Sequence, residues 1–355
     1  MMFDEMTKYG HEEVLFCADA AAKLKAIIAI HNTTLGPAIG GTRRWVYKSE
    51  EAAIRDALRL SRTMTYKFAV SGCNAGGGKI VMLVDSMEEK SEATYRALGR
   101  FIEGLNGGFT AGADVGTSTR ELKFMRAETE YVAGIPDECI GLTDVSPQTA
   151  MGVFQGIRAC LNEVFGNTEI AGKVFAIQGL GNVGSALARL LHESGGKLIV
   201  TDVDDRRIQS LAKDLNARIA GLEEIYDVQC DVFSPCALGG ILNDQTIRRL
   251  KCKIVAGAAN NQLLEDRHGD HLHERAILYA PDFVINAGGA IYGMDSVENP
   301  EPNVARAERK VLKIYEYVAK TLEIAKECGI PTYKAAESMA EERINEVRKA
   351  KKLSS

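Results

Sequence analysis

Two lysines and one aspartate are the residues of this sequence best suited to chemistry. Lys67 and Lys79 lie in a glycine-rich, otherwise apolar stretch, with no acidic residue between Tyr66 and Lys79. If one lysine is partly buried beside the other, desolvation and like charge lower its pKa, and it can act as a base. The other ammonium can bind a substrate carboxylate, and Asp114 can move a proton on the substrate. A purely structural role for both lysines is the alternative.

The run Gly76–Lys79 invites comparison with a phosphate-binding loop. A P-loop requires the pattern G-x-x-x-x-G-K followed by Ser or Thr. Position 73 is Cys and position 80 is Ile, so the spacing excludes this interpretation.

Neither the histidines nor the cysteines show the spacing of a metal site or a disulfide framework. His268, His271 and His273 lie close together, but only Asp270 is nearby. We therefore interpret them as solvated or helix-capping residues and predict no metal site. The eight cysteines are scattered without a C-x-x-C pair, which is typical of reduced thiols in a protein core. This usage fits a reducing cytoplasm.

A strand, a tight glycine turn and a helix are predicted in the stretch that must position a cofactor. The apolar run Val174–Ile177 leads into Gly179, Gly181 and Gly184, and a second apolar strand ends at Asp202. The first glycine permits the turn, the second lets the backbone approach a pyrophosphate, and the third lets the helix pack closely. The free N–H groups at the helix start can bind phosphate. This pattern predicts a dinucleotide site.

The nature of the dinucleotide follows from the acidic residue. The Asp202 carboxylate can accept hydrogen bonds from the adenosine ribose hydroxyls and would repel a 2′-phosphate, which favours NAD. Arg206 and Arg207 follow closely and keep NADP as an alternative. A structural strand-turn-helix corner without a ligand is the other alternative.

Strands and helices alternate along the chain, which predicts an α/β fold in two domains. We expect residues 1–135 to form a mixed-sheet α/β substrate and oligomerisation domain. Residues 145–330 are expected to form a Rossmann-type, doubly wound NAD-binding domain. Glycines and prolines between 133 and 146 mark the boundary. A helix over 333–355 is expected to pack back on the first domain.

Three local predictions concern the elements themselves. The segment Thr34–Thr42, with its proline and glycines, is expected to be a loop that holds the backbone close to a ligand or another strand. Ser49 is expected to cap a helix, and Ile80–Val84 to form a strand. A single long helix is expected to run from about Asn303 to Gly329.

Composition and charge limit the classes of protein to which this chain can belong. The chain has 355 residues, of which 46% are hydrophobic and 26% charged, and a formal net charge of -5. These are the proportions of a soluble globular protein long enough for two domains. The acidic balance argues against a nucleic-acid partner. The N-terminus lacks the apolar core of a signal peptide and no apolar run can span a membrane, so we expect a cytoplasmic protein.

A series of motifs extends over nearly the whole chain. They are L-G-P-A-I-G-G-T-R (Leu35–Arg43), M-T-Y-K (Met64–Lys67), G-G-G-K (Gly76–Lys79), D-V-G-T (Asp114–Thr117), G-L-G-N-V-G (Gly179–Gly184), P-C-A-L-G-G (Pro235–Gly240), A-A-N-N-Q-L (Ala258–Leu263) and I-N-A-G-G (Ile285–Gly289). In these motifs the chain resembles the leucine, valine and phenylalanine dehydrogenase group of the glutamate dehydrogenase superfamily. The resemblance implies a reversible reaction in which an L-amino acid, NAD and water give a 2-oxo acid, ammonium and NADH.

The resemblance also implies roles for individual residues. Lys67 would grip the substrate carboxylate with help from Asn260. Lys79 would be the base that activates water, and Asp114 its acid/base partner. The cofactor-binding residues would be Gly179, Gly181, Asn182, Val183, Gly184, Asp202, Thr149, Ala237 and Asn286. A homo-oligomer, assembled through the first domain, is expected from the family.

The substrate side chain is implied by a set of small and apolar positions. Besides Lys67 and Asn260, the substrate-binding positions would be Gly40, Gly41, Met64, Ala290 and Gly293, with Ile39 and Ala113 also lining the pocket. None is charged, which favours an apolar substrate over glutamate. Leucine dehydrogenases usually have Ala-Glu where this chain has Gly112 and Ala113, and valines at 290 and 293. The smaller residues widen the pocket. Leucine or another branched-chain substrate is favoured, with phenylalanine or another aromatic amino acid as the alternative.

Two other functions are weighed against this one. An NAD-linked hydroxy-acid dehydrogenase would need a histidine base facing an arginine, and none of the six histidines lies in a glycine-rich cleft segment. A catalytically inactive NAD-binding regulator is disfavoured because Lys67, Lys79 and Asp114 are all present.

Overall fold

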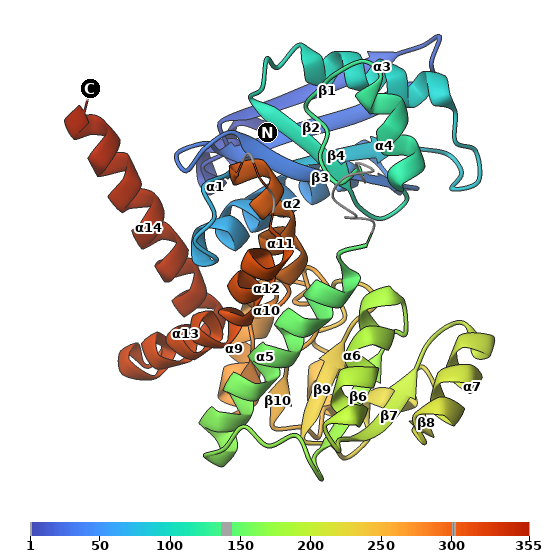
Figure 1. Cartoon of the computed structure of the whole chain (residues 1–355), viewed down its shortest axis with the longest axis vertical. Helices are drawn as coiled ribbons and strands as arrows, with labels where there is room; N and C mark the ends of the chain where they lie inside the picture. Colours follow the sequence, from blue (N-terminus) through green and yellow to red (C-terminus); the bar gives the residue numbers. More distant parts are fainter. Residues whose placement is uncertain (1, 136–143, 300, 302, 355) are drawn as a thin grey trace. The chain divides into compact units, whose positions relative to one another are not determined.

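The computed structural model describes residues 2–135, 144–299, 301 and 303–354. Its contacts divide the chain into two units, each with its own sheet (Figure 1). Unit 1 comprises Met1–Thr143, Val297–Pro302 and Ala340–Ser355, and unit 2 comprises Asp144–Ser296 and Asn303–Met339. A mixed sheet in one unit and a parallel sheet in the other confirm the predicted fold class.

Unit 1 is built on a five-stranded mixed sheet. Its elements in chain order are α1 (Met2–Tyr9), β1 (Glu13–Asp19), β2 (Leu24–Asn32), β3 (Ala38–Trp45), α2 (Glu50–Val70), β4 (Gly76–Leu83), α3 (Glu92–Glu103), β5 (Phe109–Ala113) and α4 (Thr119–Arg126). The strand order is β1-β2-β4-β3-β5. β2 is antiparallel to β1 and β4, whereas β3 is parallel to β4 and β5. As predicted, Ser49 caps α2, because its side chain accepts a hydrogen bond from Ala52 N.

Successive side chains of a strand point to opposite faces, so each face of this sheet has its own set of side chains. Different helices cover the two faces. The face toward α3 and α4 carries a large apolar cluster that includes Ile28, Ile80, Met82, Leu98 and Leu122. The face toward α2 carries a smaller one that includes Ile27, Ala29, Ala53, Ala57 and Val81. Lys79 precedes Val81 by two residues on β4, so it lies on the α2 face.

The predicted loop over 34–42 is wrong from Ala38 onward, where β3 begins. Ala38 pairs with Gly76 on one side and Phe109 on the other. β4 likewise begins at Gly76, earlier than the predicted strand at Ile80. The glycines suggested a loop, but they are needed because the backbone is crowded here. A Cβ atom on Gly78 would lie 2.4 Å from the Phe109 ring.

Unit 2 is built on a six-stranded parallel sheet. Its elements are α5 (Ser146–Phe165), β6 (Val174–Gln178), α6 (Asn182–Glu193), β7 (Lys197–Thr201), α7 (Asp205–Asp214), β8 (Arg218–Ile219), η1 (Glu224–Tyr226), β9 (Val232–Pro235), α8 (Thr246–Arg249), β10 (Ile254–Val255), α9 (Arg267–Glu274), β11 (Leu278–Tyr279), α10 (Asp282–Ile285), α11 (Gly288–Glu298), α12 (Val304–Leu312) and α13 (Ile314–Cys328). The strand order is β11-β10-β9-β6-β7-β8. The chain reverses its direction of winding between β6 and β9, and ligands of such sheets bind at this switch point.

The single long helix predicted from Asn303 to Gly329 is divided at Lys313. This residue ends α12 and begins α13, and its N–H bonds to the Lys310 carbonyl, a tighter spacing than that of an α-helix. The predicted end at Gly329 is confirmed, because this glycine has the left-handed conformation typical of helix ends.

The last helix, α14 (Thr332–Ser354), is shared between the units. Thr332 Oγ1 donates to the Tyr279 carbonyl of unit 2 at 2.6 Å. From Ala340 onward the helix groups with unit 1. There Arg343 donates to the carbonyls of Phe68, Ala69 and Cys73, each at 2.9 Å. The predicted packing of 333–355 on the first domain therefore does not hold for the first turns of this helix.

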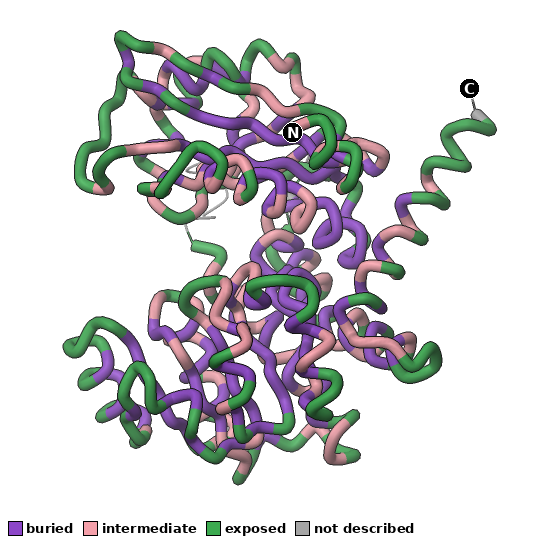
Figure 2. Tube along the Cα trace, turned by 180° about the vertical axis from the view of Figure 1, so that it is seen from behind, coloured by how far each residue is buried: buried purple, intermediate pink, exposed green. Residues whose placement is uncertain are grey.

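Burial follows the sheets in both units. Figure 2 shows buried residues concentrated in the interior of each unit, with exposed segments mostly at its edges. In the part of the chain that the structure describes, no helix is both long and apolar enough to cross a membrane.

Candidate active-site residues

The structure brings Lys79 and Asp114 into direct contact. Lys79 Nζ lies 2.9 Å from Asp114 Oδ2. Lys79 comes from the middle of β4, and Asp114 follows the last residue of β5. Their side chains are only 6% and 14% exposed, so this ion pair is largely removed from water.

A network that the sequence analysis did not identify surrounds this pair. Arg43 Nε donates to Asp114 Oδ2 at 2.9 Å, and Arg43 NH1 donates to Asp56 Oδ2 at 3.1 Å. The Tyr47 hydroxyl donates to the same Asp56 oxygen at 2.5 Å. Arg43 lies two residues beyond Gly41 on β3, so a strand assignment for this segment would have placed it on the α2 face. The loop prediction concealed that signal.

The charges of the network set the protonation of its members. Burial lowers the pKa of Lys79; the Asp114 carboxylate opposes this, and the Arg43 cation lowers the pKa further. Burial alone would raise the pKa of Asp114, but attraction to Lys79 and Arg43 outweighs it and gives a pKa of about 2. Asp114 is therefore ionised at neutral pH, while Lys79 loses its proton more easily than an ordinary lysine.

Glycines make this close arrangement possible. A Cβ atom on Gly41 would lie 2.8 Å from Asp114 Cβ and 3.2 Å from Lys79 Nζ. A Cβ atom on Gly40 would lie 1.9 Å from the Gly78 carbonyl oxygen. Both predicted substrate positions must therefore be glycine for β3 to pack against its neighbours.

Lys67 and Met64 lie on the C-terminal part of α2, and the Lys67 residue is 7% exposed. This part of the helix packs on β4 at one close crossing, where a Cβ atom on Gly77 would lie 2.0 Å from Thr65 N. The crossing brings the segments that carry the two predicted lysines together. Arg343 holds the end of the helix by bonding to its last carbonyls.

In unit 2 the three glycines of the G-x-G-x-x-G pattern, Gly179, Gly181 and Gly184, lie between the end of β6 and the first turn of α6. Gly179 has a φ of 98° and lies against Ala237, whose nitrogen would be 2.8 Å from a Cβ atom there. Gly184 contacts the Gly179 carbonyl so closely that a Cβ atom would lie 2.0 Å from its oxygen. At Gly181 a Cβ atom would meet nothing within 4 Å, so the turn is open at this point. Asn182 and Val183 begin α6.

Gly179 and Ala237 follow β6 and β9, so the structure brings two predicted cofactor residues together at the switch point of the sheet. Asp202 lies at the end of β7 and turns toward the same loop. Its Oδ2 accepts from Leu180 N at 2.5 Å, and its Oδ1 accepts from Asp204 N at 2.9 Å.

Of the two arginines that kept NADP as an alternative, Arg207 is engaged by acids. Arg207 NH1 lies 3.6 Å from Asp202 Oδ1, and Arg207 NH2 lies 3.8 Å from Asp204 Oδ2. These carboxylates offset the charge that would attract a 2′-phosphate.

Two predicted asparagines of unit 2 are hydrogen-bonded to each other. Asn286 Nδ2 donates to Asn260 Oδ1 at 2.8 Å and to the Ala258 carbonyl at 3.1 Å. Asn286 Oδ1 is buried without a hydrogen-bond partner. A buried acceptor of this kind calls for a donor, and the amide or hydroxyl groups of a bound ligand can supply one.

The remaining predicted residues of unit 2 lie along α5 and α11. Thr149 is next to Gly289, where a Cβ atom would lie 2.5 Å from Thr149 Oγ1. Ala290 and Gly293 are three residues apart on α11 and therefore on one face of it. At Gly293 a Cβ atom would meet nothing within 4 Å.

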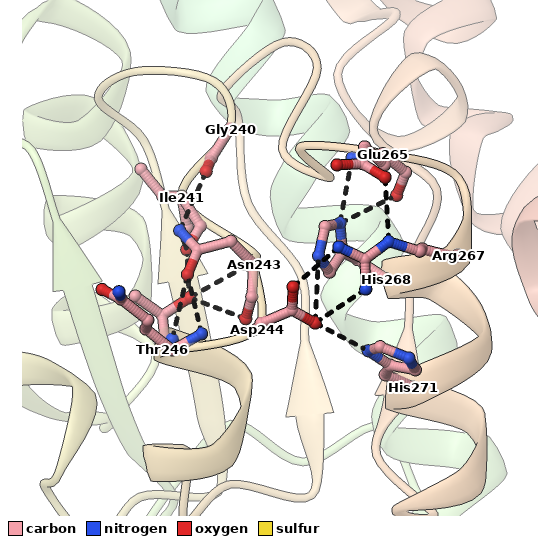
Figure 3. Close-up of polar contacts among 10 residues, drawn as sticks. Gly240, Ile241, Asn243, Asp244, Thr246, Glu265, Arg267, His268 and His271 are labelled. Carbon is pink, nitrogen blue, oxygen red and sulfur yellow. Dashed lines mark hydrogen bonds and ion pairs between the residues drawn. The ribbon is translucent and has the colours of Figure 1, made fainter.

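The histidines near residue 270 follow the prediction except in the burial of one ring. His268 is completely buried instead of solvated, but its Nδ1 accepts from Glu265 N at 3.0 Å just before α9, which is a capping contact. The acid beside it is Asp244, far away in sequence. His268 Nε2 and His271 Nδ1 each lie 3.5 Å from Asp244 Oδ1 (Figure 3). His273 is exposed, as expected. Asp270, which the sequence analysis considered, bonds instead to Tyr333 and Lys334.

Comparisons with known proteins show the family of this chain. Residues 11–131 match the sequence family described as Glu/Leu/Phe/Val dehydrogenase, dimerisation domain. Residues 141–206 and 200–352 match the family described as Glutamate/Leucine/Phenylalanine/Valine dehydrogenase.

Individual relatives cover almost the full chain. The leucine dehydrogenase of Geobacillus stearothermophilus is 52% identical over 350 residues, which are 99% of this chain and 95% of that protein. The phenylalanine dehydrogenase of Caldalkalibacillus thermarum is 45% identical over 347 residues, 96% of this chain and 93% of that protein. The crystal structure of L-tryptophan dehydrogenase from Nostoc punctiforme has a TM-score of 0.83 at 44% identity and covers 98% of this chain and 100% of that one. The chain therefore belongs to the Glu/Leu/Phe/Val dehydrogenase family, and it is an amino acid dehydrogenase.

Proposed function

We propose that this enzyme catalyses the reversible NAD-dependent oxidative deamination of an apolar L-amino acid, with leucine as its main substrate. The amino acid, NAD and water would give the 2-oxo acid, ammonium, NADH and a proton. The observation that carries the proposal is the buried Lys79–Asp114 pair, with Nζ and Oδ2 2.9 Å apart, in a chain of this family.

Lys79 is proposed as the base. Because burial lowers its pKa, its neutral form is more accessible than that of an ordinary lysine. Neutral Lys79 Nζ takes a proton from the water that adds to the oxidised Cα of the substrate. The Asp114 carboxylate, ionised at neutral pH, accepts and returns a proton on the amine nitrogen. Lys67 binds the substrate carboxylate, assisted by Asn260.

Arg43 is proposed as a positioning residue. It holds Asp114 through Nε and is itself fixed by Asp56 through NH1. Tyr47 in turn holds Asp56. This chain of bonds fixes the Asp114 carboxylate beside Lys79 and keeps it ionised, so it acts on the reaction only through that pair.

Unit 2 has features that fit NAD. Gly181 leaves the turn open for a pyrophosphate, Asn182 and Val183 supply N–H groups at the start of α6, and Asp202 can accept from the ribose. Asn286 Oδ1 offers an unpaired acceptor, and Thr149 and Ala237 border these elements. Bound NAD would supply the hydride acceptor. NADP is disfavoured because Arg207 is engaged by Asp202 and Asp204.

Leucine is favoured as the substrate because the leucine dehydrogenase of Geobacillus stearothermophilus is 52% identical to this chain, against 45% for the phenylalanine dehydrogenase cited above. A second candidate, an aromatic amino acid, is supported by the small Ala290 and by the open space at Gly293 on the same face of α11.

Initial rates of NADH formation with L-leucine, L-valine, L-phenylalanine and L-tryptophan at fixed NAD test the proposal. The highest kcat/KM is expected for leucine, and Gly293→Val should reduce the rate with phenylalanine more than the rate with leucine. A higher kcat/KM for an aromatic substrate would establish the second candidate. No turnover of any of the four, despite tight NADH binding, would overturn the proposal in favour of an inactive regulator.

The reverse reaction distinguishes an amino acid dehydrogenase from a hydroxy-acid dehydrogenase. Oxidation of NADH with 4-methyl-2-oxopentanoate, the 2-oxo acid of leucine, should require ammonium. Oxidation that is independent of ammonium would indicate reduction to a hydroxy acid instead.

We further propose that the enzyme is a homo-oligomer assembled through unit 1, because residues 11–131 match a dimerisation domain. Light scattering coupled to gel filtration tests this directly, and a monomer would contradict it. The described cysteines are free thiols. A reducing compartment such as the cytoplasm is therefore the proposed location.

A further inference from the structure

One carboxylate and two imidazoles form a cluster in unit 2 that the proposed function does not use. Asp244 precedes α8, and His268 and His271 lie on one face of α9 (Figure 3). His268 Nε2 and His271 Nδ1 are each 3.5 Å from Asp244 Oδ1, and the three ligand atoms all lie within 4.8 Å of one another. Two ligands of a tetrahedral zinc ion are separated by about 3.3 Å, so the two distances from the histidines to Asp244 are close to those of ligands that share an ion.

The buried histidine is oriented as a metal ligand would be. His268 is completely buried, yet its Nε2 has no hydrogen-bond partner. Its Nδ1 lies 3.2 Å from the Glu265 carbonyl and 3.0 Å from Glu265 N, so either ring tautomer finds a partner on that side. With the proton on Nδ1, His268 donates to the carbonyl and directs the Nε2 lone pair at Asp244. Histidines that bind metals usually donate their other ring N–H to a carbonyl or carboxylate in this way.

The charges around Asp244 leave room for a cation. Arg267 donates to both Asp244 oxygens, at 2.8 and 2.7 Å, and to Glu265 Oε2 at 2.8 Å. Each carboxylate oxygen has two lone pairs, so Asp244 Oδ1 can bind Arg267 and still face the histidines. Two carboxylates and one guanidinium leave a net negative charge, which favours a bound cation.

The loop that carries Asp244 is also fixed in place. Asn243 Oδ1 accepts from the backbone nitrogens of Gln245 and Thr246, at 3.0 and 3.1 Å. Thr246 Oγ1 donates to the Ile241 carbonyl. An ion therefore meets a carboxylate that is already held opposite α9.

We infer that Asp244, His268 and His271 form a binding site for a divalent transition metal, with zinc as the best fit and water completing its coordination. Two imidazole nitrogens and one carboxylate oxygen are a donor set typical of Zn²⁺. The ion joins the loop before α8 to α9 and stabilises unit 2 by binding its folded form. The sequence alone did not indicate a metal site, because Asp244 is distant from the histidines along the chain.

Calorimetric titration of the untagged full-length protein with Zn²⁺ tests this inference. The exposed thiol of Cys328 is first replaced by serine to remove a competing ligand. One equivalent is expected to bind, with a loss of at least about tenfold in affinity for His271→Gln and for Asp244→Asn. His273→Gln, which changes an exposed histidine of the same helix, is the matched control and should bind as the unsubstituted protein does.

The second readout is thermal unfolding. Zn²⁺ should raise the Tm of the unsubstituted protein and of His273→Gln, and should raise it less in His271→Gln and Asp244→Asn. The absence of binding at 100 μM Zn²⁺, or equal binding by all variants, would overturn the inference. Leucine-dependent NADH formation is measured separately, so failure of the metal site and failure of the proposed function give different results.

Discussion

Unit 1 and unit 2 contribute to the proposed reaction by opposite means. Unit 1 offers charged side chains that are buried and bonded to one another. Lys79 and Arg43 both lie within hydrogen-bond distance of Asp114. Unit 2 offers mainly backbone, with glycines that open a turn and a helix start. Chemistry that needs a shifted pKa requires the first kind of site, whereas a large phosphate-bearing cofactor requires the second.

This difference leads to different kinds of sensitivity. A side-chain site fails when a charge is removed, because its partners are left buried and unpaired. A backbone site fails when atoms are added, because the close approach it depends on is blocked. The following predictions test the two cases, beginning with the largest effect.

Replacing Lys79 by alanine should remove turnover while leaving unit 2 intact. Loss of the proposed base is expected to lower kcat for leucine deamination by about 10²- to 10⁴-fold. NADH affinity, followed by fluorescence titration, should be unchanged. Lys25→Ala removes an exposed lysine of β2 and is the control, with activity close to that of the unsubstituted enzyme. A normal kcat in Lys79→Ala would show that Lys79 is not the base and that the charged side chains of unit 1 do not carry the chemistry.

Two glycine variants should separate cofactor binding from folding in unit 2. Gly181→Ala adds a methyl group where nothing lies within 4 Å, so the Tm should stay the same. NADH affinity should nevertheless fall by at least about tenfold, a cost of ~1.4 kcal/mol. Gly184→Ala adds a methyl group 2.0 Å from the Gly179 carbonyl oxygen and should also destabilise the fold by about 1–3 kcal/mol. Undiminished NADH binding by Gly181→Ala would show that the turn does not hold the cofactor.

Arg43→Gln should change the pH dependence of the reaction more than its maximum rate. The Arg43 cation lowers the pKa of Lys79, so its removal raises that pKa. The acid limb of the kcat/KM profile should then move to higher pH, on the order of one unit. Arg43→Lys keeps the charge and should show a smaller shift. An unshifted profile in Arg43→Gln would limit this arginine to a structural role.

The smallest expected effect concerns acid stability. Burial lowers the pKa of His31 to about 3, and its ring nitrogens bond to Thr65 Oγ1 and the Tyr9 carbonyl. Below the ordinary value of 6.5 the unfolded chain binds a proton that the folded chain does not, so stability falls as pH drops from 6.5 toward 3. The expected loss is about 1 kcal/mol per pH unit.

Calorimetry at pH 7 and pH 5 measures this effect. The Tm of His31→Gln should depend less on pH than that of the unsubstituted protein. His192→Gln, a change in unit 2, should leave the dependence as it is. The same pH dependence in all three proteins would place the acid-sensitive groups elsewhere.

The contrast between the side-chain site of unit 1 and the backbone site of unit 2 also explains which features could be predicted from the sequence. Gly179, Gly181 and Gly184 act through local backbone geometry, so their spacing, together with the flanking strand and helix patterns, predicted the turn that the structure contains. Arg43 and Asp56 act through long-range contacts that depend on the pairing of β3 with its neighbours. The glycines of β3 suggested a loop, because the crowding that requires them arises only once the sheet is assembled.

His268 illustrates the same limit in unit 2. Its neighbours along the chain suggested solvent exposure or helix capping, but they gave no indication that the fold buries it beside Asp244. Lys79 and Asp114 were predicted as partners because both stand in a glycine-rich setting and in family motifs. Arg43, which joins Asp114 to Asp56, became visible only with the register of the strands.

Chemical rescue of Lys79→Ala tests the central claim most directly, because an added amine can replace the missing base without altering unit 2. The measurement is leucine-dependent NADH formation by this variant as a function of methylamine or ethylamine concentration at several pH values. We predict that the rate rises in proportion to the free-base form of the amine, while NADH affinity stays constant. A variant that binds NADH normally but shows no rescue by either amine would contradict the assignment of Lys79 as the base.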